Sequence, residues 1–389
     1  MKQRMALLVT AALAVSACAD TPTTPMLAEA GPSFSIAGAD VIPGRFIVTL
    51  RDGDSPAAVV RDHGVSPDYV YTAALNGFAG AISDAARSGL LRDARVTRVE
   101  PDGIARTSTT QSNATWGIDR IDQRALPLSG TFTYTNTGSG VTAYIIDTGI
   151  DYTHNEFGGR ATFGYDSFGG NGNDCNGHGT HVAGTTGGTV YGVAKSVALK
   201  AIRVLDCAGS GTWSGVIAGI DWVTANRTLP AVANMSLGGG ANSSVDDAVK
   251  RMIAAGVGTA VAAGNGNAGG VAQDACKYSP ARVPEAMTIG ATTKTDAKSS
   301  WSNFGKCVDW FAPGAGITSA WIGSGNTEIN TISGTSMAAP HAAGVAALYL
   351  QSNPGASAQA VRDALYNNTT KSIVTSSKTA NNHLLFTNY

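Results

Sequence analysis

The chain has 389 residues, of which 43% are hydrophobic and 14% are charged, and it contains 48 glycines. This length and apolar content allow one large domain or two domains with a sizeable core, and they argue against a disordered chain. The formal net charge at pH 7 is only −1. This charge excludes the strongly basic surface that attracts polyanions, so we expect no nucleic-acid partner.

Residues 1–19 are typical of an export signal, because two basic residues precede the apolar run Met5–Val15 and small residues follow it. The run is too short to be a permanent membrane span. Two cleavage patterns fit. Ala17-Cys-Ala19 suits an ordinary signal peptidase, whereas Val15-Ser-Ala-Cys18 resembles the bacterial lipobox, in which the cysteine is lipidated. We favour the lipobox, with residues 20–39 as a linker that tethers the precursor to a membrane.

Residues 40–108 predict a small α+β domain. Strand-like alternation of apolar and polar residues is interrupted by two short helical stretches, in the order βαββαβ. The segment has no cysteine, and His63 is its only histidine, so we expect no chemistry there. Strands are expected over residues 45–50, 69–75, 77–82 and 96–101, and helices over residues 55–63 and 83–93.

Residues 109–389 predict an α/β domain. Continuous apolar segments alternate with helical ones, which indicates a parallel sheet covered by helices on both faces. In such sheets, ligands bind outside the carboxyl ends of the strands. Strands are expected over residues 141–146, 198–204, 232–236, 258–263 and 287–291, and helices over residues 213–226, 244–255 and 334–350.

Two acid-base candidates lie near such strand ends. Asp147 ends a predicted strand, and His178 opens a glycine-rich segment. A carboxylate there can orient an imidazole that shuttles protons at neutral pH, although an Asx-turn or a helix cap is the ordinary alternative for the aspartate. His178 and His181 are three residues apart, whereas a zinc protease helix needs two histidines four apart with a glutamate beside the first. We therefore do not expect zinc.

Two further polar residues suit the stabilisation of negative charge. Asn265 follows a predicted buried strand, and Ser336 begins a predicted helix. A side-chain amide can donate to an oxyanion, and a hydroxyl at a helix N-terminus lies in a field that favours negative charge. Taken singly, Asn265 fits an ordinary turn better than a catalytic role, and Ser336 fits a helix cap and a nucleophile equally well.

Four cysteines follow the signal, and an even number in an exported chain indicates disulfides. Three pairings of four cysteines are possible. No Cys-x-x-Cys spacing occurs, which argues against a zinc site. The cysteines are Cys175, Cys207, Cys276 and Cys307.

The segments that carry these residues are Asp-Thr-Gly, His-Gly-Thr-His, Ala-Gly-Asn and Gly-Thr-Ser-Met-Ala-Ala-Pro. In this order they resemble the subtilisin-like serine proteases, or subtilases, in which Asp, His and Ser follow one another along the chain. The resemblance covers residues 109–389. It is strongest to the proteinase K branch and its aqualysin-like members, because the segment from Trp116 to Gln123 and the placement of the cysteines are similar.

The resemblance implies a secreted, monomeric serine endopeptidase that needs no cofactor for catalysis. By this resemblance Ser336 is the nucleophile and His178 is the general base and then the acid. Asp147 is the carboxylate that holds the imidazole tautomer. Asn265 stabilises the oxyanion together with the backbone N–H of Ser336.

The resemblance also gives the remaining segments a meaning. Residues 40–108 are then an inhibitor-type propeptide, which assists folding and is cut off by the protease itself near Ser108 and Thr109. The implied disulfide pairs are Cys175 with Cys207 and Cys276 with Cys307.

Substrate contacts follow from the same resemblance. Two edge segments hold an extended peptide by main-chain pairing, which gives broad specificity. Small residues at a strand end leave a roomy apolar pocket, so we expect an aromatic or aliphatic residue just before the cut bond. The edge segments contain Gly209, Ser210, Gly211 and Trp213 on one side and Ser236, Leu237 and Gly238 on the other; the pocket residues are Ala262, Ala263 and Gly264.

Structural calcium is expected at two places, because hard oxygen ligands suit this ion. The first place resembles a calcium site of the branch. The second resembles only part of another site, since Ser129 and Thr131 stand where related enzymes carry better oxygen ligands. Solvated surface charges are the alternative for each acid. The expected ligands are Asp309, Pro284 and Ala286 at the first place, and Asp119, Asp122 and Gln123 at the second.

Two other functions stay open. An α/β-hydrolase esterase would use residues 334–338 as its nucleophile elbow, with Asp363 and His383 following in the order of that fold. That assignment needs a glycine where the last elbow residue is alanine, and it leaves Asp147 and His178 unexplained. A catalytically silent, lipid-anchored binding protein would keep the fold, but the complete set of four active-site residues argues against it.

Overall fold

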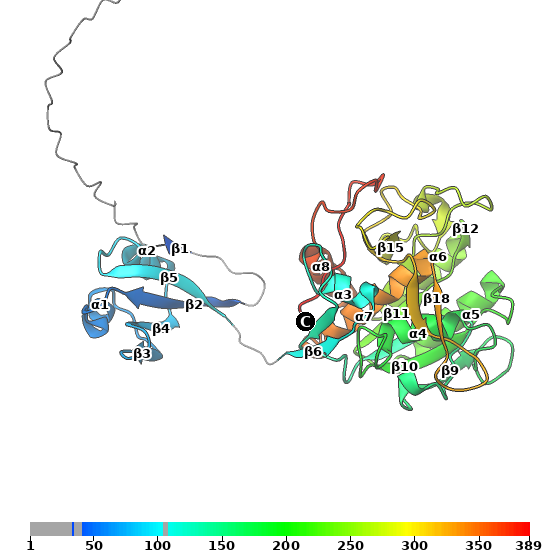
Figure 1. Cartoon of the computed structure of the whole chain (residues 1–389), viewed down its shortest axis with the longest axis horizontal. Coiled ribbons are helices and arrows are strands. Elements are labelled where there is room, and N and C mark those ends of the chain that lie inside the picture. Colours follow the sequence, from blue (N-terminus) through cyan, green and yellow to red (C-terminus); the bar gives the residue numbers. More distant parts are fainter. Residues whose placement is uncertain (1–32, 35–40, 104–107) are drawn as a thin grey trace, which may run out of the picture. The chain divides into compact units, whose positions relative to one another are not determined.

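The computed structural model describes residues 33–34, 41–103 and 108–389. The chain forms two compact units, with the division between Arg106 and Thr107 (Figure 1). The predicted export signal, its Cys18 and most of the predicted linker lie outside the described residues.

The N-terminal unit has the predicted βαββαβ order over residues 41–103, preceded by a two-residue strand that the sequence does not predict. Its elements are β1 (Ser33–Phe34), β2 (Val41–Leu50), α1 (Pro56–Asp62), β3 (Tyr69–Tyr71), β4 (Gly77–Ala81), α2 (Asp84–Leu90) and β5 (Val96–Gly103). They form one sheet in the order β1-β5-β2-β4-β3. Phe46, Val48 and Leu50 alternate along β2 and are buried, whereas the residues between them are half-buried, so one face of the strand builds the core.

Strand β3 is shorter than the sequence predicts. It pairs with β4 as an antiparallel hairpin in which Tyr71 lies opposite Gly77. The five residues between them must therefore form the turn, and the predicted strand cannot continue to residue 75.

The C-terminal unit is built on a parallel sheet of seven strands in the order β16-β15-β13-β11-β8-β10-β9. Two of these strands, β9 and β16, are not predicted from the sequence. The strands are β8 (Thr142–Asp147), β9 (Ala161–Asp166), β10 (Ala198–Arg203), β11 (Ala231–Met235), β13 (Val257–Ala262), β15 (Met287–Thr292) and β16 (Trp310–Pro313).

Helices cover both faces of this sheet, as predicted (Figure 1). Alternate residues of the central strand β8 enter different cores. Ala143 and Ile145 pack in the core that includes α4 (His178–Gly187) and α7 (Thr335–Ser352). Tyr144 and Ile146 pack in the core with α5 (Trp213–Asn226) and α6 (Ser243–Ala254). A strand buried on both sides needs the continuous apolar sequence observed here.

The order of the strands changes direction at β8. From β8 the chain runs to β9 and back through β10 on one side, and it then crosses to β11 on the other side. The carboxyl end of β8, at Asp147, is therefore the topological switch point where α/β sheets bind ligands. Outside this sheet, the antiparallel hairpin of β17 (Ile317–Ala320) and β18 (Ile329–Ile332) leads directly into α7.

A buried ion pair fastens the short helix α3 (Trp116–Ile121) to the rest of this unit. Arg120 is fully buried, and its Nε and Nη2 donate to the two carboxylate oxygens of Asp296 over 2.7 and 3.0 Å. Its Nη1 donates to the carbonyl of Gln123. This fork-to-fork geometry compensates both charges where water cannot.

We expect Arg120→Met to lower the free energy of unfolding by about 3–5 kcal/mol, because it leaves the Asp296 carboxylate buried without its partner. Denaturant unfolding followed by tryptophan fluorescence measures this loss. Lys250→Met, which breaks the exposed pair with Asp247, is the control and should leave the midpoint close to that of the unaltered chain. Equal midpoints for both variants would contradict the role of the buried pair.

Candidate active site

A carboxylate and an imidazole meet at the switch point. Asp147, the last residue of β8, is fully buried, and its Oδ1 lies 2.7 Å from Nδ1 of His178, the first residue of α4. The same oxygen accepts the backbone N–H of Thr148 over 2.8 Å. A carboxylate at Nδ1 keeps the proton on that nitrogen and leaves Nε2 to act as a base.

Two glycines allow these segments to approach each other. Gly149 has φ of +109°, a left-handed conformation that side chains rarely adopt. A Cβ at Gly179 would lie only 2.2 Å from the carbonyl oxygen of Gly149. The glycines of Asp-Thr-Gly and His-Gly-Thr are thus needed for the contact between Asp147 and His178.

The electrostatic surroundings of His178 differ from those of the other buried histidines. Burial pulls the pKa of His178 down, but the charge and hydrogen bond of Asp147, with a contribution from Asp174, raise it above its usual value. His178 is also accessible, with 25% of its side chain exposed. It is therefore the histidine of this region that can exchange protons with a bound molecule.

The histidines at 181 and 341 have structural roles. Burial lowers the pKa of each to about 4, so both are neutral at pH 7. His181 Nε2 donates to the carbonyl of Ile317, and His341 Nδ1 donates to the carbonyl of Met337. His341 is close to Ser336 in sequence, yet it is packed inside α7 and offers no base.

Ser336 is the second residue of the long helix α7. Its Oγ donates to the carbonyl of Ser236 over 3.2 Å, and Ser236 Oγ donates to the carbonyl of Ser336 over 2.7 Å. Within the described part of the chain, no hydrogen bond joins Ser336 Oγ to His178. Such contacts are often long without a substrate and tighten when one binds.

Asn265 is held by the residue before the serine. Its Oδ1 accepts both the N–H and the hydroxyl of Thr335, each over 2.8 Å. This fixes the amide so that its Nδ2 is the end left to donate. The buried Asn303 shapes the loop from below, because its Nδ2 donates to the carbonyl of Ala263 and its Oδ1 accepts the N–H of Gly266. Thr335 belongs to the Gly-Thr-Ser segment, but no sequence pattern predicts its bonds to Asn265 or singles out Asn303.

Two hollows meet at the predicted edge segment that contains Ser236. One has a volume of about 570 Å³ and lies beside His178, and the other has a volume of about 230 Å³ and lies beside Ser336 and Asn265. All ten predicted substrate contacts line these hollows. The larger is lined by Gly209, Ser210, Gly211, Trp213, Ser236, Leu237 and Gly238, and the smaller by Ser236, Leu237, Gly238, Ala262, Ala263 and Gly264.

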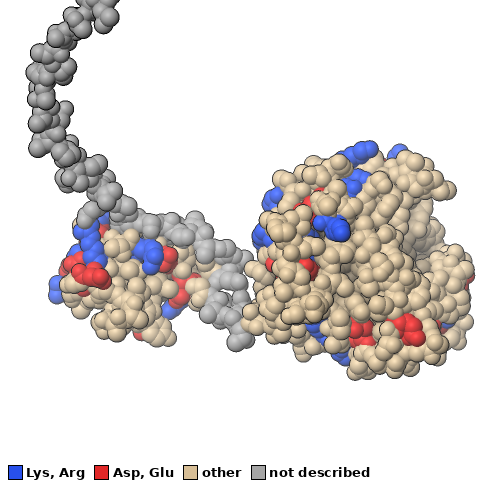
Figure 2. Space-filling model, in the orientation of Figure 1, with Lys and Arg blue, Asp and Glu red and all other residues tan. Residues whose placement is uncertain are grey.

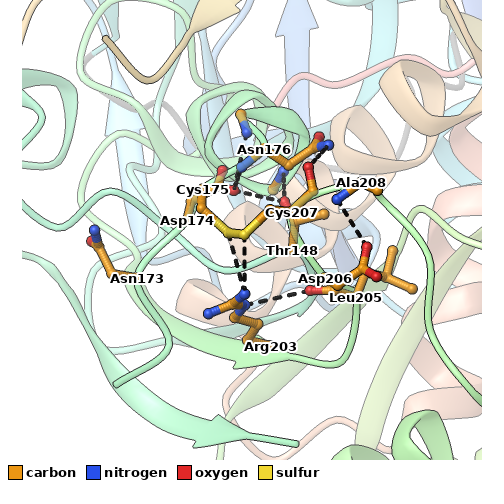
Figure 3. Close-up of a disulfide and its surroundings, with 12 residues drawn as sticks. Thr148, Asn173, Asp174, Cys175, Asn176, Arg203, Leu205, Asp206, Cys207 and Ala208 are labelled. Carbon is orange, nitrogen blue, oxygen red and sulfur yellow. Dashed lines mark hydrogen bonds between the residues drawn. A yellow bond between two sulfur atoms is a disulfide. The ribbon is translucent and has the colours of Figure 1, made fainter. Parts of the chain in front are cut away.

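Both expected disulfide pairs, Cys175–Cys207 and Cys276–Cys307, form. The first lies next to the site (Figure 3). It ties the loop before His178 to the segment that leads to the predicted edge at Gly209. Asn176 reinforces this tie, since its Nδ2 donates to the carbonyl of Cys207 over 2.9 Å.

The residues around Asp309 do not fit a calcium ion. Arg362 Nη2 donates to Asp309 Oδ1 over 2.5 Å, and Arg362 Nε donates to the carbonyl of Ala286 over 3.2 Å. Asp309 Oδ2 accepts the N–H of Thr288. Two of the three oxygen donors predicted here, those of Asp309 and Ala286, are thus satisfied by a guanidinium, and Pro284 supplies only a neutral carbonyl. These contacts argue against calcium at the first place.

The second expected calcium place gathers oxygen atoms. Ser129 Oγ lies 2.8 Å from both Asp119 Oδ1 and Thr131 Oγ1, and Gln123 Oε1 accepts the N–H of Ser129. Asp122 Oδ1 is buried and has no hydrogen-bond partner among the described residues. Burial raises the pKa of Asp122 to about 6; the N–H of Thr133 opposes the shift, and the Asp119 charge adds to it. A cation would relieve both the repulsion and the unpaired oxygen.

Comparison with known proteins agrees with this geometry. A sequence model described as "Subtilase family" matches residues 138–386, and one described as "Peptidase inhibitor I9" matches residues 55–108. The chain belongs to the subtilase family. It is a subtilisin-like serine peptidase of the EC 3.4.21 type, preceded by an inhibitor-type propeptide domain.

Several relatives are similar over most of the chain. An "Extracellular serine proteinase" of Thermus sp. (strain Rt41A) is 49% identical, and the match covers 93% of each chain. An "Alkaline serine exoprotease A" of Vibrio alginolyticus is 49% identical over 83% of this chain and 61% of its own. The solved structure of a cold-adapted subtilisin-like serine proteinase is 53% identical, with a TM-score of 0.68, and covers 71% of this chain and 98% of its own.

Figure 2 shows sparse charged side chains, with most of the visible face of the catalytic unit neither acidic nor basic. Among the described residues, no helix has both the length and the apolarity to cross a bilayer.

We expect the double variant Cys175→Ser/Cys207→Ser to lose about tenfold in kcat/KM, mainly through a higher KM, because the two walls of the larger hollow are no longer tied. Steady-state hydrolysis of a peptide anilide measures both constants. Cys276→Ser/Cys307→Ser is the matched control: it should keep KM and lose about 2–4 kcal/mol of stability. An unchanged KM in the first variant would contradict this role.

Proposed function

We propose that this chain is the precursor of a secreted endopeptidase in which Ser336, His178 and Asp147 hydrolyse peptide bonds. The observation that carries the proposal is the 2.7 Å contact between Asp147 Oδ1 and His178 Nδ1 at the switch point of the sheet. Ser336 stands at the start of the helix that forms the other wall of the same site.

The reaction begins with the serine hydroxyl. The Nδ1–H of His178 donates a hydrogen bond to Asp147 and keeps its proton, so Nε2 is unprotonated and takes the proton from Ser336 Oγ as that oxygen attacks the peptide carbonyl. The carbonyl oxygen becomes an oxyanion, which accepts hydrogen bonds from Asn265 Nδ2 and the N–H of Ser336. His178 then protonates the leaving amine, and water attacks the acyl-enzyme by the same route.

The raised pKa of His178 sets the acid side of the activity profile. The reaction needs neutral His178, so kcat/KM falls as the pH drops through this pKa, which lies above the ordinary value of 6.5. The same shift makes the imidazole a stronger proton acceptor from the serine. We therefore infer an enzyme that works best in neutral to alkaline solution.

Substrate selection rests on backbone and shape. The edge segments at Gly209–Gly211 and Ser236–Gly238 offer main-chain groups to an extended peptide, which supports broad specificity. The small residues Ala262 and Gly264 line the smaller hollow and leave it roomy, so it accepts an aromatic or aliphatic side chain of the substrate residue just before the cut bond.

The N-terminal unit supports self-processing of a precursor. The inhibitor match over residues 55–108 ends at the predicted cut near Ser108 and Thr109. We infer that residues 1–19 direct export, that residues 40–108 assist folding and inhibit the enzyme until they are removed, and that residues 109–389 act as a monomer on protein substrates.

We expect Ser336→Ala to accumulate as the uncut precursor and to lose amidase activity by at least about 10⁴-fold, because no nucleophile remains. Gel analysis and a serine-directed covalent inhibitor, which should add mass to the unaltered chain alone, measure this. Asp147→Ala should lose activity similarly. Asp363→Ala is the control, because Asp363 is exposed on α8 (Ala358–Asn368) and should be dispensable. Activity lost only in the Asp363 variant would favour the α/β-hydrolase.

We propose that one calcium ion stabilises this enzyme. The Asp119 and Asp122 carboxylates would hold the ion with the side-chain oxygens of Gln123, Ser129 and Thr131, and the ion would supply the positive charge that this cluster lacks. It would fasten α3 to the strand β7 (Thr131–Tyr134). Catalysis itself needs no metal in this scheme.

We expect added Ca²⁺ to raise the unfolding temperature above about pH 6 and to have little effect well below it, because Asp122, with its pKa of about 6, must be ionised to bind. Because the pKa of Asp122 is higher in the folded chain, its protonated form favours the folded state. Without Ca²⁺, this stability is lost as the pH rises through about 6. Calorimetry of Asp122→Asn should show no Ca²⁺ effect. Asp309→Asn is the control and should keep the Ca²⁺ effect on the unfolding temperature. A Ca²⁺ effect lost only in this control would contradict a calcium site at Asp119 and Asp122.

A further inference from the structure

A second buried carboxylate lies beside the proposed catalytic pair. Asp174 precedes Cys175, and only 6% of its surface is exposed. Figure 3 shows it next to Thr148 and Asn176. Its two oxygens accept five hydrogen bonds: Oδ1 from Thr148 Oγ1 (2.9 Å), Asn176 N (2.9 Å) and Gly177 N (3.0 Å), and Oδ2 from Thr180 N (2.9 Å) and Thr180 Oγ1 (2.7 Å).

These donors come from both sides of the site. Thr148 follows Asp147 at the end of β8, whereas Gly177 and Thr180 flank His178 at the start of α4. Thr148 Oγ1 adds a return link, because it accepts the N–H of Gly179 over 2.8 Å. Asp174 and Thr148 thus form a bridge between the two segments, in addition to the contact of Asp147 with His178 and the bond that Asp151 N donates to Thr180 Oγ1 over 3.0 Å.

A helix cap alone does not explain this arrangement. Helix α4 has a glycine, Gly177, at its N-cap, so the Asp174 carboxylate takes over the capping of Thr180. A cap needs one oxygen and one or two N–H groups. The bond from Thr148 goes beyond capping, because it also fixes the turn that carries Asp147. A buried ion with five donors is held rigidly, since losing any of them exposes charge to an apolar surrounding.

We propose that Asp174 is a positioning residue for peptide hydrolysis: through its bonds to Thr148 and to the start of α4 it sets the distance and orientation of Asp147 against His178. The inference rests on the proposed function of that pair. Asp174 touches neither substrate nor the reacting atoms, and it acts through the two segments it joins.

Asp174 also has an electrostatic effect on His178. The charged groups that face His178 are Asp147 from β8 and Asp174 from the preceding loop, and both raise its pKa. His181, the titratable neighbour on α4, is neutral at pH 7 because its pKa is about 4. Removing the charge of Asp174 therefore lowers the pKa of His178, a change that a purely structural residue would not cause.

The test is Asp174→Asn in the full-length, self-processing chain, with a peptide anilide as substrate over a range of pH. We expect kcat to fall by about 10- to 100-fold with KM changed by less than about twofold. We also expect the acid limb of kcat/KM to move to lower pH. Unchanged kcat, or a loss confined to KM, would overturn the inference.

Asp166→Asn is the matched control. Asp166 is also buried, and it caps the same loop by accepting the N–H groups of Phe168 and Gly172 over 2.8 and 3.0 Å, but it bonds to neither segment of the catalytic pair. It should keep kcat and the acid limb of the unaltered enzyme. An equal loss in both variants would mean that loop order, rather than the bridge, matters.

Thr148→Val keeps the inference testable if Asp174→Asn does not mature. This variant removes the hydrogen bond from Thr148 Oγ1 to Asp174 without removing a charge, so kcat should fall while the acid limb of kcat/KM stays at the same pH. Unchanged kcat in Thr148→Val would overturn the bridge. Failure of the unaltered chain to react with a serine-directed inhibitor would instead refute the proposed function, so the two failures are distinguishable.

Discussion

The chemistry of this subtilase depends on one buried carboxylate at the end of one central strand. Asp147 lies where the sheet is covered on both sides, so its charge is cut off from water and must be compensated locally. Its Oδ1 is compensated by hydrogen bonds with His178 and the N–H of Thr148, whereas its buried Oδ2 has no hydrogen-bond partner among the described residues. The imidazole is in turn held in the tautomer that a base needs, which means that one interaction serves both stability and function.

Close backbone packing makes this interaction possible. Asp147 ends β8 and His178 begins α4. A Cβ at Gly149 would lie 2.5 Å from the carbonyl oxygen of Gly172, and a Cβ at Gly179 would collide with the carbonyl oxygen of Gly149. Glycine is therefore used where segments meet rather than only where chains turn. From composition alone, the many glycines of this chain indicate tight turns. At this site they are also needed to bring the acid and the base together.

Positive charge is supplied in different ways around the domain. Arg120 and Arg362 neutralise buried acids from within the chain, and Arg362 takes the place beside Asp309 that the family resemblance assigned to calcium. The cluster at Asp119 and Asp122 has no such cation among the described residues, and an unpaired carboxylate oxygen remains there. This contrast is the reason why we propose an ion at one expected metal place and not at the other.

The sequence by itself determined the alternating α/β order, the doubly covered sheet, the small βαββαβ unit and the four segments of the proposed site, because periodicity and short motifs are local properties of a chain. It missed the strands β9 and β16, whose edge positions leave them short or half-exposed. Only the tertiary structure decided that Arg362 reaches Asp309 across 53 residues and that Asp174 joins Thr148 to Thr180. Those contacts depend on which loops the sheet order brings together, and no local pattern encodes that.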